Sequence, residues 1–165
     1  MKFLAGLVVG VVLAVLAPLA WLAGGKLDVS AAAETGALEQ RLAPWVVERS
    51  IAAHAPAARN PHADDPESLA RGRAHYRAMC VACHGAPGVE IGEIGRGLNP
   101  VPPSLDVPAV QRRSDGELFW IVKRGIRMSG MPAFGGTHDD AELWALVSFV
   151  RRLPRLADED RRMLR

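Results

Sequence analysis

The chain has 165 residues, and its 20 basic and 18 acidic side chains give a formal net charge of +2. A charge so close to balance carries no signature of a nucleic-acid-binding protein, which concentrates Lys and Arg on one face. The length allows one modest domain with additional segments, and a domain of that size has a thin hydrophobic core.

The first segment is apolar from Phe3 to Ala23, and Pro18 is its only interruption. At 1.5 Å rise per residue, it is long enough to cross the roughly 30 Å hydrocarbon layer of a bilayer. A cleaved signal peptide has a shorter apolar region of about 7–15 residues, which favours a retained anchor. The small residues at 30–33 leave cleavage open. We predict an N-terminal transmembrane helix within residues 1–25. The few charged residues on either side of it hardly indicate its orientation in the membrane.

Residues 26–60 form the next segment, which is rich in alanine and is broken by Gly36, Pro44 and Pro56. Apolar residues at helical spacing occur only around 45–51. Two interpretations stay open for this tether. It is either a juxtamembrane helix that lies on the domain or on a partner, or a partly ordered linker.

A helix is predicted from Pro66 into Cys80, at the start of a domain that spans residues 61–165. Asp65 can accept hydrogen bonds from the free N–H groups at the start of the helix, and proline suits its first position. Leu69, Tyr76 and Cys80 share one face at this spacing. The helix therefore delivers Cys80 on its buried side.

Both cysteines of the chain lie in the string Cys80-Val81-Ala82-Cys83-His84. Two thiols at this spacing can form thioether bonds to the two vinyl groups of one haem, and the adjacent imidazole can then bind the iron. A structural zinc site would need four ligands, and there is no second cysteine pair. A thioredoxin-like CxxC lies between a strand and a helix, whereas here a predicted helix precedes the motif and a glycine-rich loop follows it. A simple disulfide would leave His84 without a role. The motif therefore predicts one covalently bound haem c per chain.

After the motif, glycines and prolines leave no room for regular structure before about position 110. A loop of this length is unusual in a compact domain unless it wraps an object, and a flat haem is such an object. Ser114 and Glu117 then form a capping box, which predicts a helix over 115–124 that a glycine ends.

The last predicted helix begins near a second apparent capping box, formed by Thr137 and Asp140. Apolar residues at helical spacing continue from Leu143 until Pro154 stops the helix. The charged tail at 157–165 is predicted to be frayed. No segment alternates with period two, so the fold class is all-α, with three to four short helices joined by long Gly/Pro loops.

Three strings between Asp65 and Leu153 resemble a class I cytochrome c of the short bacterial type. They are Ala70-Arg71-Gly72 leading through Tyr76 into the CxxCH and Gly85, Gly97-Leu98-Asn99-Pro100-Val101-Pro102-Pro103-Ser104-Leu105, and Lys123-Arg124-Gly125 followed by Gly130-Met131-Pro132-Ala133-Phe134-Gly135. The resemblance implies a cytochrome c fold around one haem with His/Met ligation. It also implies haem attachment outside the cytoplasm, so that the domain lies on the periplasmic side of the inner membrane.

Two methionines, Met128 and Met131, lie in the loop where the resemblance implies the sixth iron ligand. In the family that ligand precedes Pro-Ala-Phe, which selects Met131 and leaves Met128 as the second choice. The family also implies that a proline carbonyl accepts the free ring N–H of His84, and this proline is Pro102 or Pro103. A thioether ligand favours Fe(II) and raises the haem potential.

These features favour an electron carrier of a respiratory or dehydrogenase chain, which hands single electrons to redox partner proteins or a membrane complex. The sequence offers no acid–base pair or nucleophile beyond the haem ligands, so we expect no enzymatic activity. A different interpretation is a haem-based gas-binding or sensor module, with an open or easily vacated sixth position. The basic residues around the helix predicted over 115–124 form either a solvated face or a docking patch for an acidic partner. They are Arg112, Arg113, Lys123, Arg124 and Arg127.

Overall fold

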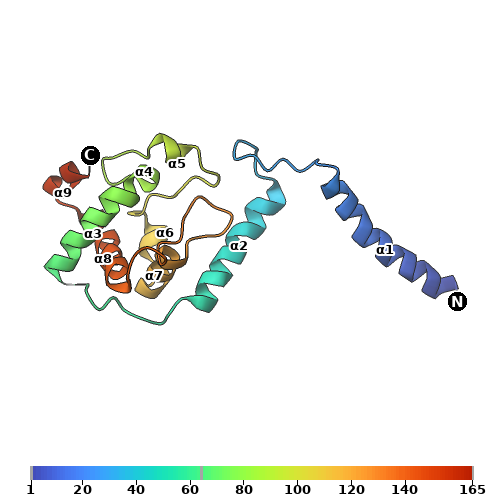
Figure 1. Cartoon of the computed structure of the whole chain (residues 1–165), viewed down its shortest axis with the longest axis horizontal. Helices are drawn as coiled ribbons and strands as arrows, with labels where there is room; N and C mark the ends of the chain where they lie inside the picture. Colours follow the sequence, from blue (N-terminus) through green and yellow to red (C-terminus); the bar gives the residue numbers. More distant parts are fainter. Residues whose placement is uncertain (1, 64, 165) are drawn as a thin grey trace. The chain divides into compact units, whose positions relative to one another are not determined.

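The computed structural model describes residues 2–63 and 65–164, and this part of the chain contains helices and no β-strand (Figure 1). The all-α prediction is therefore confirmed. The chain divides into two compact units, Met1–Glu34 and Thr35–Arg165. The helices are α1 (Lys2–Ala23), α2 (Ala37–His54), α3 (Pro66–Met79), α4 (Val81–His84), α5 (Glu93–Arg96), α6 (Pro108–Gln111), α7 (Asp115–Arg124), α8 (Asp140–Arg152) and α9 (Asp158–Met163), with a 3-10 turn at Leu153–Arg155.

The first unit contains α1, a continuous helix of 22 residues that includes Pro18. None of its side chains is buried. Among the described residues, α1 is the one helix long and apolar enough to cross a membrane, a property that signal sequences near an N-terminus share.

In the second unit, the tether that precedes the haem motif forms the helix α2. Ile51 on α2 is only 1% exposed, and the ring of His54 stacks on Trp120 of α7 with 6.0 Å between the ring centroids. Glu48 of α2 forms an ion pair with Arg113. Helix α2 therefore lies on the rest of this unit, which agrees with the interpretation of residues 26–60 as a helix on the domain and not with a partly ordered linker.

The centre of the second unit is the crossing of α3 and α8, drawn in green and orange-red in Figure 1. A Cβ atom on Gly72 would lie 2.0 Å from the carbonyl oxygen of Ala145, so only glycine allows the helices to approach this closely. One turn further along α3, Tyr76 packs on Phe149 with 5.3 Å between the ring centroids. The crossing thereby fixes the direction in which α3 runs toward the cysteines.

Both of the longer helices after the loop begin with a capping box, but only one of the two was predicted at the right residues. The Ser114–Glu117 box at the start of α7 is confirmed, with both reciprocal hydrogen bonds present. The predicted Thr137–Asp140 box is wrong, since Asp139 caps α8 together with Glu142. The hydroxyl of Thr137 instead bonds the carbonyl oxygen of Phe134, in the turn before the helix.

Two segments that were predicted to be irregular contain helical turns. In the loop after the motif, α5 and α6 form, and a proline occupies the first position of α6. The tail was predicted to be frayed but forms α9 between Leu156 and Leu164, which are 4% and 2% exposed. An ion pair of 2.6 Å between Arg73 and Asp160 also holds it against α3.

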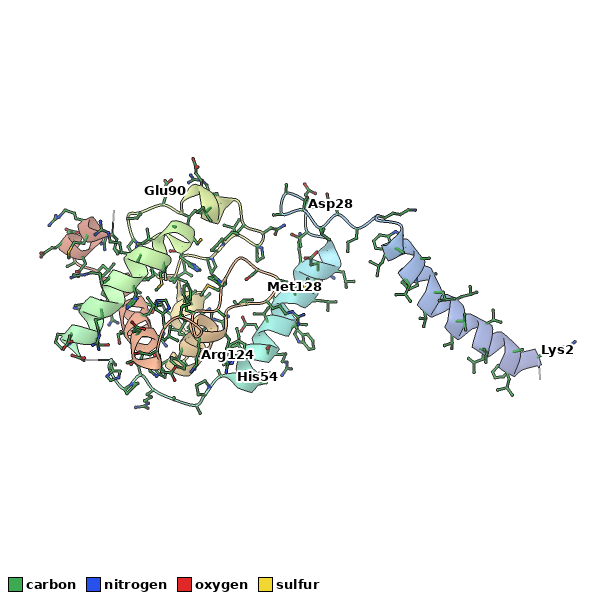
Figure 2. All side chains as sticks on the ribbon, viewed as in Figure 1. Lys2, Asp28, His54, Glu90, Arg124 and Met128 are labelled. Atoms are coloured by element: carbon green, nitrogen blue, oxygen red, sulfur yellow. The ribbon has the colours of Figure 1, made fainter. Side chains whose placement is uncertain are left out.

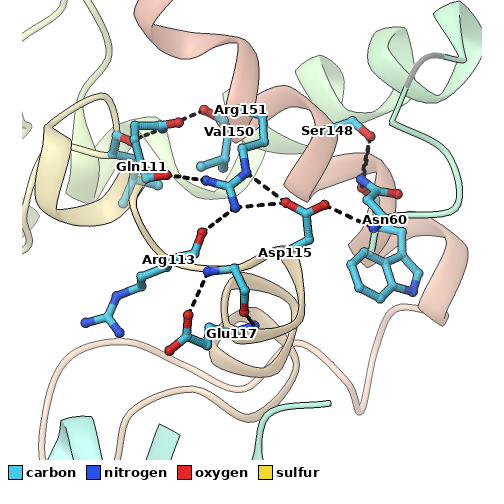
Figure 3. A network of polar contacts seen from close by, with 11 residues as sticks. Asn60, Gln111, Arg113, Asp115, Glu117, Ser148, Val150 and Arg151 are labelled. Carbon is cyan, nitrogen blue, oxygen red and sulfur yellow. Dashed lines mark hydrogen bonds and ion pairs between the residues drawn. The ribbon is translucent and has the colours of Figure 1, made fainter. Parts of the chain in front are cut away.

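The connection from α2 to α3 is fastened to the core by a buried polar network, shown in Figure 3. The backbone N–H of Asn60 donates to Asp115 Oδ2 at 3.0 Å, and its side-chain amide donates to Ser148 Oγ at 2.8 Å. Arg151 Nε donates to the other oxygen of Asp115 at 2.8 Å. A Cβ on Gly116 would lie 1.9 Å from the carbonyl oxygen of Pro56, so the connection passes directly over the start of α7.

Candidate haem site

The two cysteines lie on a single turn at the junction of α3 and α4. Cys80 caps the end of α3, and its carbonyl oxygen accepts hydrogen bonds from the N–H groups of Cys83 at 3.1 Å and His84 at 2.8 Å. Both thiols are free, with Cys80 buried and Cys83 half-buried. Burial, with a smaller contribution from Cys83, raises the pKa of the Cys80 thiol to about 12.

A buried tyrosine holds the residue that follows the motif. The hydroxyl of Tyr76 donates to the carbonyl oxygen of Gly85 at 2.7 Å, inside the protein. Burial also raises the pKa of Tyr76. Gly85 adopts a φ of +62°, and a Cβ there would lie 2.6 Å from the carbonyl oxygen of Val89. This hydrogen bond was not predicted from the sequence, although a buried phenol usually has a hydrogen-bond partner.

Two glycines of the following loop pack directly against the motif. A Cβ on Gly92 would lie 2.8 Å from the carbonyl oxygen of Ala82, and one on Gly95 would lie 2.6 Å from that of Cys83. The N–H of Gly92 also donates to Ala82 at 3.0 Å. The loop therefore supports the turn that carries the cysteines, and any side chain larger than hydrogen at these positions would displace it.

The imidazole of His84 is oriented by the loop that follows α5. Its Nδ1 lies 2.8 Å from the carbonyl oxygen of Pro103. A carbonyl can only accept, so Nδ1 carries the proton and Nε2 keeps a free lone pair. Burial lowers the pKa of His84, and the hydrogen bond to Pro103 opposes this shift in part. The neutral ring that results is the form that binds a metal ion.

The loop after α7 is pinned to the end of that helix. The N–H of Ile126 donates to the carbonyl oxygen of Met131 at 3.2 Å, and the N–H of Phe134 donates to Val122 at 3.1 Å. Gly125, at a φ of +66°, leaves room for this return, because a Cβ there would lie 2.7 Å from the same Met131 oxygen. Ser129 Oγ accepts the N–H of Met131 at 3.1 Å.

The two methionines of this loop have different surroundings. Met128 has a positive φ of 61°, and its side chain is 92% exposed. Met131 is half-buried and packs against the hydrophobic cluster that also contains Cys80. The structure therefore brings Met131, and not Met128, to the core that the motif borders.

The chemistry of these groups fits a covalently bound haem. Two free thiols stand on one turn, a neutral imidazole keeps one nitrogen available, and a thioether lies at the border of the same apolar core. Within residues 2–63 and 65–164, no three His, Cys, Asp or Glu side chains gather in a way that could hold a metal ion by themselves. An iron at this site would depend on the porphyrin as well as on protein ligands.

The basic residues that were considered as a docking patch are used in different ways. Arg113 pairs with Glu48, and Lys123 Nζ lies 2.6 Å from Asp140 Oδ1. Arg124 and Arg127 are exposed, and neither forms an ion pair within the part of the chain that the structure describes.

A family model described as cytochrome C oxidase, cbb3-type, subunit III matches residues 67–150, just over half of the chain. The chain belongs to this family of c-type cytochrome domains. The match begins inside α3 and ends inside α8, so it covers the motif, the supporting loop and the Met131 loop. No curated protein resembles the chain closely enough to count as a relative. Residues 67–150 are therefore a c-type cytochrome domain, consistent with a single-haem class I cytochrome c, and the general role of such a domain is haem-based electron transfer.

Proposed function

We propose that the chain carries single electrons on one haem c, which is bound through thioethers at Cys80 and Cys83 and has His84 and Met131 as axial ligands. The hydrogen bond between His84 Nδ1 and Pro103 carries this proposal, because it leaves the lone pair of Nε2 available for the iron. A haem c supplies an iron that changes between Fe(III) and Fe(II) by one electron.

Each protein group has a separate task in this proposal. The thioethers keep the cofactor attached to a small domain, and the carbonyl of Pro103 fixes the tautomer and orientation of His84. The sulfur of Met131 favours Fe(II), which raises the potential. The packing of half-buried Met131 against the core and the 92% exposure of Met128 support this choice of ligand.

For localisation, we propose that α1 remains attached and anchors the chain in the inner membrane. Its 22 residues without a buried side chain support this role. Residues 1–25 would then be the anchor, 26–60 the juxtamembrane segment and 61–165 the cytochrome domain on the periplasmic side. The partners would be a redox protein or a membrane-bound respiratory or dehydrogenase complex, and no substrate chemistry is proposed beyond electron transfer.

The test is the visible spectrum of the purified, reduced chain, recorded with and without carbon monoxide. Six-coordinate iron predicts that the wild type binds carbon monoxide slowly or not at all, whereas Met131→Ala binds it rapidly. Met128→Ala is the matched control, because it removes a thioether from the same loop and should behave as the wild type. Rapid binding by the wild type would favour the gas-binding interpretation, and an open iron only in Met128→Ala would reassign the ligand.

A further inference from the structure

A hollow of the cytochrome unit lies between α2 and α7, and none of its lining residues is a cysteine or His84. It is a groove of about 800 Å³. Its walls come from α2, from α7 and from residues 125–128 at the start of the Met131 loop. Figure 2 labels three of the lining residues, which come from different segments: His54 at the end of α2, Arg124 at the end of α7 and Met128 in the loop after it.

The wall that α2 provides is firmly held. Ile51 is buried, His54 stacks on Trp120, and Glu48 pairs with Arg113. Beyond the end of α2, Asn60 is bonded to the core. The groove is therefore a preformed feature with a rigid wall, as binding sites in folded proteins usually are.

Apolar side chains line the groove and extend beyond it along α2. Val46, in the wall, is 53% exposed, and Leu42, one helical turn before it, is 49% exposed. Trp45 beside them is 59% exposed. The apolar surface is thus elongated along a helix axis, a shape that suits another helix better than a compact small molecule.

The charge on the groove has one sign. Lys123, Arg124 and Arg127 line it, and no Asp or Glu does within the described part of the chain. Lys123 is neutralised by Asp140, whereas Arg124 and Arg127 form no ion pair among those residues. A segment that covers the apolar wall would therefore also meet two unpaired guanidinium groups.

We propose that this groove is a docking site for an acidic amphipathic helix of a protein partner. The apolar face of that helix would cover Val46 and Met128, and its carboxylates would pair with Arg124 and Arg127. Ile126 also lines the groove, and its N–H donates to the carbonyl oxygen of Met131, so the docked helix contacts the loop of the proposed haem ligand. The docking itself does not depend on which residue binds the iron.

The experiment places a photoreactive benzoylphenylalanine at Val46 or at Met128 of the full-length chain, which is then irradiated in the native membranes. Ile94 is the control position, because it is 68% exposed and lies on α5, outside the groove. Crosslinked peptides are identified by mass spectrometry, and the haem spectrum of each variant is recorded.

We expect both groove positions, and not Ile94, to crosslink to one segment that has apolar residues at helical spacing and a net negative charge. Combining either probe with Arg124→Glu and Arg127→Glu should reduce the yield about tenfold, because two attractive contacts become repulsive. The pair Arg77→Glu and Arg155→Glu, exposed arginines outside the groove, should leave the yield unchanged.

Four results would overturn the proposal: no crosslink above the Ile94 control, a crosslink to lipid, a crosslink to a second copy of this chain, or a crosslinked segment without acidic residues. A normal haem spectrum together with any of these would refute the docking site and leave the proposed electron transfer standing. The expected crosslink together with a wild-type spectrum that does not fit six-coordinate haem c would support the docking site and refute the proposed electron transfer.

Discussion

Replacing Gly72 by alanine should destabilise the cytochrome unit, because the added Cβ has no space at the α3–α8 crossing. It would lie 2.0 Å from the carbonyl oxygen of Ala145 and 3.1 Å from the Cβ of Phe149. Both obstacles are backbone or Cβ atoms, which cannot rotate away, so the helices must separate by about 1 Å or more. Overpacking of this kind costs about 1–3 kcal/mol.

Alanine also favours the helix over glycine, which offsets about 1 kcal/mol of that cost. Since the helices themselves must move, we expect an overpacking cost near the upper limit of about 3 kcal/mol. After the gain in helix propensity is subtracted, the free energy of unfolding should fall by about 2 kcal/mol. For a unit of this size, such a loss lowers the melting temperature by about 6–10 °C. The covalent haem should remain attached, so haem content is not the readout.

The assay is denaturant unfolding of the full chain in detergent, followed by circular dichroism. Gly136→Ala is the matched control, because a Cβ there meets nothing within 4 Å and its φ lies outside the positive range, so its stability should change by less than about 0.5 kcal/mol. Equal midpoints for Gly72→Ala and Gly136→Ala would refute the close crossing of α3 and α8.

Three further outcomes follow from the contacts of the second unit. Asn60→Ala should lower the free energy of unfolding by about 2 kcal/mol, because it removes three side-chain hydrogen bonds of a buried residue, whereas a surface substitution would not; denaturant unfolding measures this. Asp139→Ala should cost about 1 kcal/mol through the lost cap of α8, and Asp139→Asn should recover most of it in the same assay. Deleting residues 2–34 should leave the melting temperature of the cytochrome unit unchanged. Deleting residues 2–60 also removes Ile51 and Asn60 and should lower the free energy of unfolding by about 3–5 kcal/mol. Equal melting temperatures for the two deletions would contradict the role of α2.

The features that could be predicted from the sequence are those set by neighbouring residues. Asp65 and the following proline start α3, and Ser114 with Glu117 starts α7, because a cap and its partner lie within one helical turn. The spacing that puts Cys80 on a buried face is equally local. Before α8 the local pattern predicted a cap at Thr137, two residues too early, because Asp139 caps the helix.

The features that were missed depend on residues far apart in the chain. Asn60 bonds Ser148, 88 positions later, and no pattern around an isolated asparagine indicates this. Helix α9 is ordered by the burial of Leu156 and Leu164 and by the ion pair of Asp160 with α3, so its charged composition was misleading. For the sixth iron ligand, the sequence offered two methionines on one loop, and only the tertiary environment distinguishes their burial.

The central claim is that one haem, bound by His84 and Met131, carries single electrons. A spectroelectrochemical titration of the purified full chain tests it most directly. The account predicts one transition that fits a one-electron Nernst curve, with one haem per chain, and a midpoint potential that falls on the order of 0.1 V in Met131→Ala but not in Met128→Ala. A titration with two components, or a potential that Met131→Ala leaves unchanged, would contradict it.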